Sequence, residues 1–142
     1  MDDYSKNPLS APADLIEGVL KDNSMMIMLG PSGSGKSTLA LQVIHSLASG
    51  TDFLGQSVTP TNGGFGVLSY DMDGAMVHDW MSGFPGLDPK RVSIVNAYKR
   101  GNPVGVPDMR AKIAATWRSM GVEIVVLDSF SASFFGHDQN DA

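Results

Sequence analysis

The sequence has no cysteine among its 142 residues. A disulfide framework is therefore excluded, and so is a metal site built on thiolates. Long apolar runs are also missing, because no stretch approaches the roughly 20 residues that cross a bilayer. The N-terminus, Met1 to Lys6, is acidic and polar, and no apolar stretch of signal-peptide length follows it. These absences predict a cytoplasmic protein with no membrane partner.

Positive charge is scarce, since 10 Lys and Arg residues stand against 15 Asp and Glu, for a formal net charge of -5. A broad basic surface that holds nucleic acid by neutralising phosphates is thereby excluded, so any nucleic-acid contact must be local or shared among subunits. The other proportions, 42% hydrophobic and 18% charged, are typical of a globular chain. At this length we expect one domain, with a flexible lead-in at residues 1–12 and the core at residues 13–142.

Apolar patterns along the chain predict helices alternating with strands. After the lead-in, Ser10 is placed to cap a helix whose apolar stripe is Leu15, Ile16, Val19 and Leu20. An unbroken apolar run, Met25 to Leu29, predicts a strand buried on both faces. Further strands are expected at residues 66–71, 92–96 and 123–127, and further helices around residues 39–48, 76–81 and 109–118. This alternation predicts an α/β fold with a parallel sheet flanked by helices.

A glycine-rich loop follows the apolar run at residues 30–37. Its sequence, Gly-Pro-Ser-Gly-Ser-Gly-Lys-Ser, matches the phosphate-binding pattern GxxxxGK[ST] at every fixed position. The glycines let backbone N–H groups point inward, and the start of the next helix adds positive potential. Lys36 is expected to reach the outer phosphates of ATP, and Ser37 to be a ligand of Mg²⁺. The nucleotide-binding residues are predicted to be Gly30, Pro31, Ser32, Gly33, Ser34, Gly35, Lys36, Ser37 and Thr38.

Carboxylates follow two of the predicted strands. Asp128 ends an apolar strand, where a carboxylate can hold the magnesium water shell beside Ser37. Asp71 and Asp73 lie just past an earlier strand, and ligands bind at the carboxyl ends of parallel strands. We favour Asp71 over Asp73 as the group that orients the attacking water, although this segment also suits a solvated turn. The predicted catalytic set is Lys36, Asp71 and Asp128.

Two other groups of residues have competing interpretations. The polar residues near the C-terminus could form a metal cluster, but they have no matching partner, so a polar chain end is favoured. The larger aromatic residues could stack on a base, but their helical spacing favours core packing. The polar residues near the C-terminus are His137, Asp138, Asn140 and Asp141, and the aromatic residues are Trp80, Phe84 and Trp117.

Taken together, these residues resemble the RecA-like ATPases. The closer resemblance is to the hexameric replicative-helicase type, which includes plasmid RepA helicases and related phage and bacterial AAA-type proteins. It covers residues 13–141 and is strongest from residue 14 to residue 40. Residues 68–72 look like the strand whose end carries a catalytic glutamate, which places that role on Asp71, and residues 125–132 look like the magnesium-aspartate strand. Because aspartate is one methylene shorter than glutamate, the resemblance implies slower hydrolysis or a differently held water.

The resemblance implies an ATPase that acts with Mg²⁺ in a homo-oligomeric ring or filament. Its implied partner is single-stranded DNA, in replication or recombination, with a helicase or loader-type motor role. The family's chain continues with further core strands and an arginine that reaches a neighbouring subunit's ATP, so the present sequence is expected to be the front portion of the core, incomplete at the C-terminus, either truncated or naturally shortened. Among the arginines of this sequence, Arg100 is the candidate to take the place of that family arginine.

Two alternatives stay open on sequence grounds. A P-loop kinase would move the γ-phosphate onto a small acceptor, but no segment is an obvious arginine-bearing lid. Strand order separates this alternative from the first, because a further strand lies between the loop strand and the Asp128 strand in RecA-like proteins, whereas the two are adjacent in simple kinases. The other alternative is a nucleotide-binding interaction module with no useful turnover.

Overall fold

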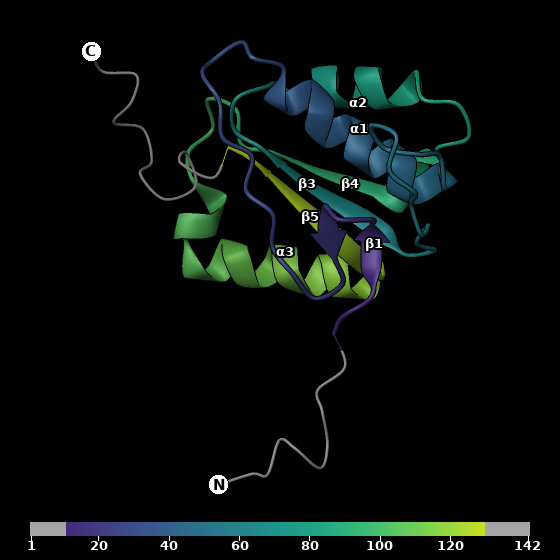
Figure 1. Cartoon of the computed structure of the whole chain (residues 1–142). Coiled ribbons are helices and arrows are strands. Elements are labelled where there is room, and N and C mark those ends of the chain that lie inside the picture. Colours follow the sequence, from purple (N-terminus) through teal and green to yellow (C-terminus); the bar gives the residue numbers. More distant parts are fainter. Residues whose placement is uncertain (1–10, 130–142) are drawn as a thin grey trace, which may run out of the picture.

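The computed structural model describes residues 11–129 as a parallel sheet with helices on both faces (Figure 1). The sheet has the strand order β4-β3-β5. Its strands are β3 (Gly64–Ser69), β4 (Val92–Asn96) and β5 (Val122–Asp128). One face carries α1 (Lys36–Ser49) and α2 (Gly74–Ser82), and the other carries α3 (Pro107–Ser119). The α/β class and the parallel sheet are thus confirmed.

Short elements complete the described part of the chain. The hairpin β1 (Asp14–Ile16) and β2 (Leu20–Lys21) is antiparallel and separate from the main sheet. Two 3-10 helices, η1 (Pro89–Arg91) and η2 (Pro103–Gly105), flank β4 in the sequence. No helix within residues 11–129 is long and apolar enough to cross a membrane.

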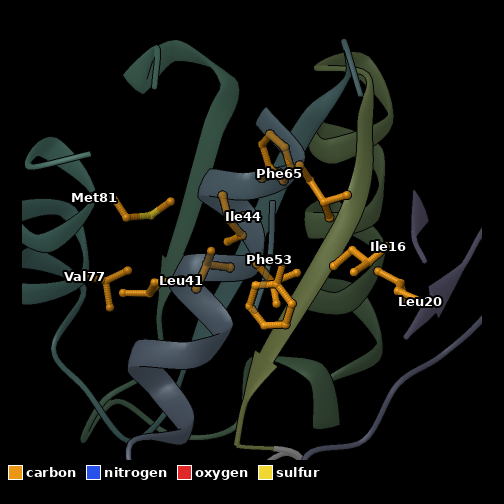
Figure 2. Packing of buried hydrophobic residues seen from close by; sticks show 11 residues of the cluster. Ile16, Leu20, Leu41, Ile44, Phe53, Phe65, Val77 and Met81 are labelled. Carbon is orange, nitrogen blue, oxygen red and sulfur yellow. The ribbon is translucent and has the colours of Figure 1, made fainter. Parts of the chain in front are cut away.

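The core lies between the sheet and the helices α1 and α2. Phe65 and Val67 of β3 are buried and pack in one cluster with Ile44 of α1 and Val77 of α2 (Figure 2). Side chains of this size contribute about 1.5–3 kcal/mol each when fully buried. All six residues of β3 are buried, which makes this strand the centre of the domain.

On the opposite face of the sheet, Trp117 of α3 packs against β3. A Cβ atom on Gly66 would lie 2.8 Å from the Trp117 ring, so the glycine lets the indole approach the strand. The indole N–H donates to Ser93 Oγ at 2.9 Å. Phe84 stacks on His45 with ring centroids 4.8 Å apart. Core packing therefore holds for Phe84, which is half-buried against the core cluster, whereas Trp117 is half-buried on the sheet outside that cluster. Trp80 is 42% exposed, so the expectation was wrong for it.

The helix expected from Ser10 through Leu20 is wrong in its described part, because residues 14–21 form the β1–β2 hairpin. Gly18 has a φ of 68°, a left-handed conformation that a helix does not contain and that glycine adopts readily. The Asp14 carboxylate accepts from the Gly18 N–H at 3.2 Å and from Lys21 Nζ at 2.8 Å. A local turn with its own hydrogen bonds thus replaces the expected helix.

The strand expected at Met25 to Leu29 is also wrong as stated. Alternate side chains, Met26 and Met28, contact the core cluster, but Met25 is 78% exposed and Leu29 is 90% exposed. None of the hydrogen bonds found in residues 11–129 involves the backbone of this segment, so it has no ladder partner. A cavity of about 470 Å³ lies between the segment and β5. The side chains of the apolar run therefore alternate between half-buried and exposed as in a strand, but the run is not part of the sheet.

Candidate nucleotide-binding site

The glycine-rich loop connects the segment after Met25 to the start of α1. Gly33 and Gly35 have φ values of 75° and 88°, which explains glycine at these two positions. Residues 30–35 are all exposed. The first turn of α1 has no side-chain cap and no acidic residue, so its N–H groups and positive end are available to an anion. The loop and helix together form an open phosphate-binding site.

The Lys36 ammonium group lies over this loop. Nζ donates to the carbonyl oxygens of Gly30 at 2.7 Å and of Pro31 at 2.8 Å. Both acceptors are neutral and belong to the loop itself. A phosphate oxygen accepts a stronger, charge-assisted hydrogen bond from a lysine than a carbonyl does. The side chain is therefore held where it can exchange these contacts for phosphate.

Ser37 and Asp128 meet although they are 91 residues apart in the chain. The Ser37 hydroxyl donates to Asp128 Oδ2 at 2.6 Å. Burial raises the pKa of Asp128; the Ser37 hydrogen bond opposes this shift, the Asp71 charge adds to it and the Lys36 charge again opposes it. The structure thus brings the predicted metal ligands, Ser37 and Asp128, into direct contact, with Lys36 and Asp71 within electrostatic range.

The oxygen donors at this contact fit Mg²⁺. A serine hydroxyl and a carboxylate are hard ligands, and Mg²⁺ in nucleotide sites takes only one or two protein ligands plus phosphates and water. Within the described residues there is no group of three or more His, Cys, Asp or Glu side chains that could hold a metal. Ser37 and Asp128 would hold the ion, which would neutralise charge on the phosphates. The acidic and histidine residues near the C-terminus, from His137 onward, lie outside the described residues.

The structure gives Asp71 and Asp73 different surroundings. The Asp73 carboxylate caps α2, because Oδ1 accepts from the Ala75 N–H at 2.8 Å. Asp71 is exposed, and its carboxylate accepts no hydrogen bond from the described residues. The backbone N–H groups of Tyr70 and Asp71 both donate to the Asp128 carbonyl, at 2.6 and 3.3 Å. This shared acceptor holds the ends of β3 and β5 together and places Asp71 beside Asp128.

Sequence reasoning missed a side-chain contact at the same edge. The Tyr70 hydroxyl donates to Asn102 Oδ1 at 2.6 Å, and burial raises the pKa of Tyr70. Asn102 stands in a Gly and Pro loop, where an asparagine indicates a turn. That signal marks the turn alone, because no sequence pattern pairs two residues 32 positions apart in different loops.

The parallel sheet, the glycine-rich loop and the Ser37–Asp128 contact define a P-loop nucleotide-binding domain. The chain belongs to the AAA-domain family, whose model matches residues 1–142. Neither a curated protein nor a solved structure matches the chain. Membership of this family confirms the AAA-type, RecA-like P-loop class that the sequence predicted, and it makes the chain a P-loop NTPase domain.

Proposed function

We propose that the chain binds ATP with Mg²⁺ and hydrolyses it. The contact between Ser37 and Asp128 supports this proposal most directly, because it joins the end of the phosphate loop to a carboxylate on a different strand. Phosphoryl transfer needs little covalent help from a protein, so positioned charges supply most of the acceleration. A P-loop that only cradles phosphate has no need of that carboxylate.

Each residue of the proposed site has a distinct role. Lys36 binds the outer phosphates in place of its present carbonyl partners, and Ser37 with Asp128 holds the magnesium ion. Asp71 orients the attacking water, since its carboxylate is exposed and lies at the same sheet edge as Asp128. Asp73 is the weaker candidate because it already caps α2.

The family match, rather than strand order, favours a RecA-like ATPase over a P-loop kinase. In a simple kinase the loop strand lies next to the strand that bears the magnesium aspartate. Here β5 pairs with β3, and the cavity of about 470 Å³ separates β5 from the segment Met25 to Leu29. No described strand lies between the two segments, so strand order gives the RecA-like arrangement no advantage over the kinase. The preference for an ATPase is supported by the family match instead.

The finer proposal is a motor that acts on single-stranded DNA, as a replicative helicase or loader, within a homo-oligomeric ring or filament. Its support is the RecA-like resemblance of the loop and of the two carboxylate-bearing strands. The net charge of -5 requires any contact with DNA to be local. The same resemblance supports a role in replication or recombination.

Phosphate release by the full chain, with and without oligo-dT, tests the proposal. We expect magnesium-dependent release that oligo-dT stimulates, and its loss in Asp128→Asn. Asp108→Asn is the matched control, because Asp108 is an exposed carboxylate in the first turn of α3. Binding of a fluorescent ATP analogue without any phosphate release would favour the non-catalytic module. Transfer of the γ-phosphate to an added small acceptor would favour the kinase.

A further inference from the structure

The basic loop, residues 97–102, follows β4 and carries two adjacent cations, Lys99 and Arg100. Both side chains are exposed. Lys99 Nζ lies 5.1 Å from the centroid of the Tyr98 ring. Neither cation takes part in an ion pair with a described residue. In a chain with a net charge of -5, two adjacent unpaired cations form a local positive site.

The backbone holds these cations in a defined turn. Lys99 has a φ of 53°, a conformation that is uncommon for a residue other than glycine. The Arg100 N–H donates to the Ala97 carbonyl at 3.1 Å, and the Tyr98 N–H donates to Asn96 Oδ1 at 3.2 Å. Uncommon backbone conformations of this kind persist where the surroundings fix them, and they concentrate at functional sites.

The basic loop lies at the same sheet edge as the nucleotide site. The Ala97 N–H donates to the Ser69 carbonyl at 2.8 Å, so the loop leaves β4 where β3 turns toward Asp71. At its other end, Asn102 accepts from the Tyr70 hydroxyl. Figure 1 shows the chain before α3 at the same end of the sheet as the chain that leads into α1.

The charges near the basic loop come from several elements. Arg110 of α3 points to η2, where Nη1 donates to the Val104 carbonyl at 3.1 Å. Asp71 follows β3 at the same sheet edge, and Asp108 lies in the first turn of α3. The positive charge at this edge is thus confined to the loop, where Lys99 and Arg100 offer exposed donors for a phosphate.

We propose that Lys99 and Arg100 bind the phosphate backbone of single-stranded nucleic acid. The inference rests on the proposed motor function and names the residues that contact the nucleic acid. Lysine and arginine side chains supply the sequence-independent part of such binding by neutralising phosphates. A contact limited to one loop satisfies the requirement that a chain of net negative charge must bind nucleic acid locally.

Fluorescence anisotropy of labelled oligo-dT, measured on the full chain with a non-hydrolysable ATP analogue, tests the inference. The double variant Lys99→Ala/Arg100→Ala removes both cations. We expect an affinity about tenfold lower. The slope of log K against log salt concentration should also become shallower by about 1.4, since each phosphate contact on a single strand contributes about 0.7 to that slope. The matched control, Lys112→Ala/Arg118→Ala, removes the same charge from exposed positions of α3 and should change the affinity less than about twofold.

Several outcomes would overturn the inference. One is equal loss in the two double variants, which would show diffuse attraction rather than a site. Another is unchanged oligo-dT binding with reduced phosphate release, which would assign Arg100 to a neighbouring subunit's nucleotide. A third is the absence of oligo-dT binding by the unmodified chain. Titration with the fluorescent ATP analogue is run on every sample, so a failure of the nucleotide site itself is distinguished from a failure of the basic loop.

Discussion

The central strand and the phosphate-binding loop differ sharply in how they are held. Strand β3 is buried along its whole length, and Phe65 has no exposed surface. The loop at residues 30–35 is exposed throughout, and Leu29 before it is 90% exposed. Packing of β3 and β5 therefore fixes where the carboxylates stand, while the loop is positioned by its own glycine conformations and by Lys36. Substitutions in the two regions should separate stability from ligand binding.

Phe65→Ala should produce the largest effect. The buried ring packs in the core and lies under the Arg91 guanidinium, 5.3 Å from its carbon Cζ. Removing it should lower the free energy of unfolding by about 3–5 kcal/mol. Urea unfolding measures the loss, with Leu29→Ala as the control, which should stay within about 0.5 kcal/mol. Similar losses in the two variants would mean that the loop region is as firmly packed as β3.

Asp71→Asn should affect the reaction step alone. A group that orients and deprotonates water acts in the transition state, so turnover should fall at least about a hundredfold while ATP affinity is kept. Asp73→Asn is the matched control, since asparagine also caps a helix and preserves the contact with Ala75. Phosphate release under single-turnover conditions measures both. If Asp73→Asn is the slower variant, Asp73 is the residue that orients the attacking water.

Lys36→Ala should weaken binding without weakening the fold. The present partners of Nζ are carbonyl groups of the exposed loop, so their loss costs little stability. Deleting a charge-assisted contact with phosphate should cost roughly 1.5–3 kcal/mol, which is about tenfold to a hundredfold in affinity. Titration of a fluorescent ATP analogue measures this change. Lys90→Ala, an exposed lysine of η1, should bind normally; unchanged affinity in Lys36→Ala would contradict the role of the loop.

Local patterns let the sequence predict much of this fold. The glycine-rich loop, the helix after it and the strand at residues 92–96 are each specified by adjacent residues, and Gly50 ends α1 with a φ of 77° as its position suggests. The region from residue 14 to residue 29 was misassigned, because a hairpin with a Gly18 turn has an apolar spacing similar to that of a helix. Whether Met25 to Leu29 joins a sheet depends on a distant neighbour, which its own composition does not encode.

The candidate site shows the same division. Asp128 was identified because it ends an apolar strand, the position of a carboxylate that holds the magnesium water shell beside Ser37. The roles of Ser37, Asp71 and Asp128 in catalysis stay predictions. The choice between Asp71 and Asp73 needed the structure, since the cap on α2 depends on where that helix begins. The contact between Tyr70 and Asn102 depends on two loops meeting in space.

The smallest effect expected here concerns Asp128 and the stability of the unliganded protein. Burial raises the pKa of this carboxyl above its ordinary value of 3.8 in the folded state. The folded chain therefore holds the proton more tightly than the unfolded chain, so this group's contribution to stability falls as pH rises from 3.8 through the folded pKa. At neutral pH the ionised carboxylate is a net cost, although partial exposure keeps that cost below about 1 kcal/mol.

Asp128→Asn should accordingly raise the free energy of unfolding at about pH 7 by a fraction of a kcal/mol, and this gain should vanish at about pH 3, where both states of the wild type are protonated. The asparagine oxygen can still accept from Ser37, so the hydrogen bond is kept. Urea unfolding at the two pH values measures the difference. Asp108→Asn should lower the free energy of unfolding at neutral pH, because the carboxylate in the first turn of α3 interacts favourably with the helix dipole. A loss of stability in Asp128→Asn at neutral pH would show that the Ser37 hydrogen bond to the ionised carboxylate outweighs its burial, and that the magnesium site is stabilised in advance rather than held at a cost to the fold.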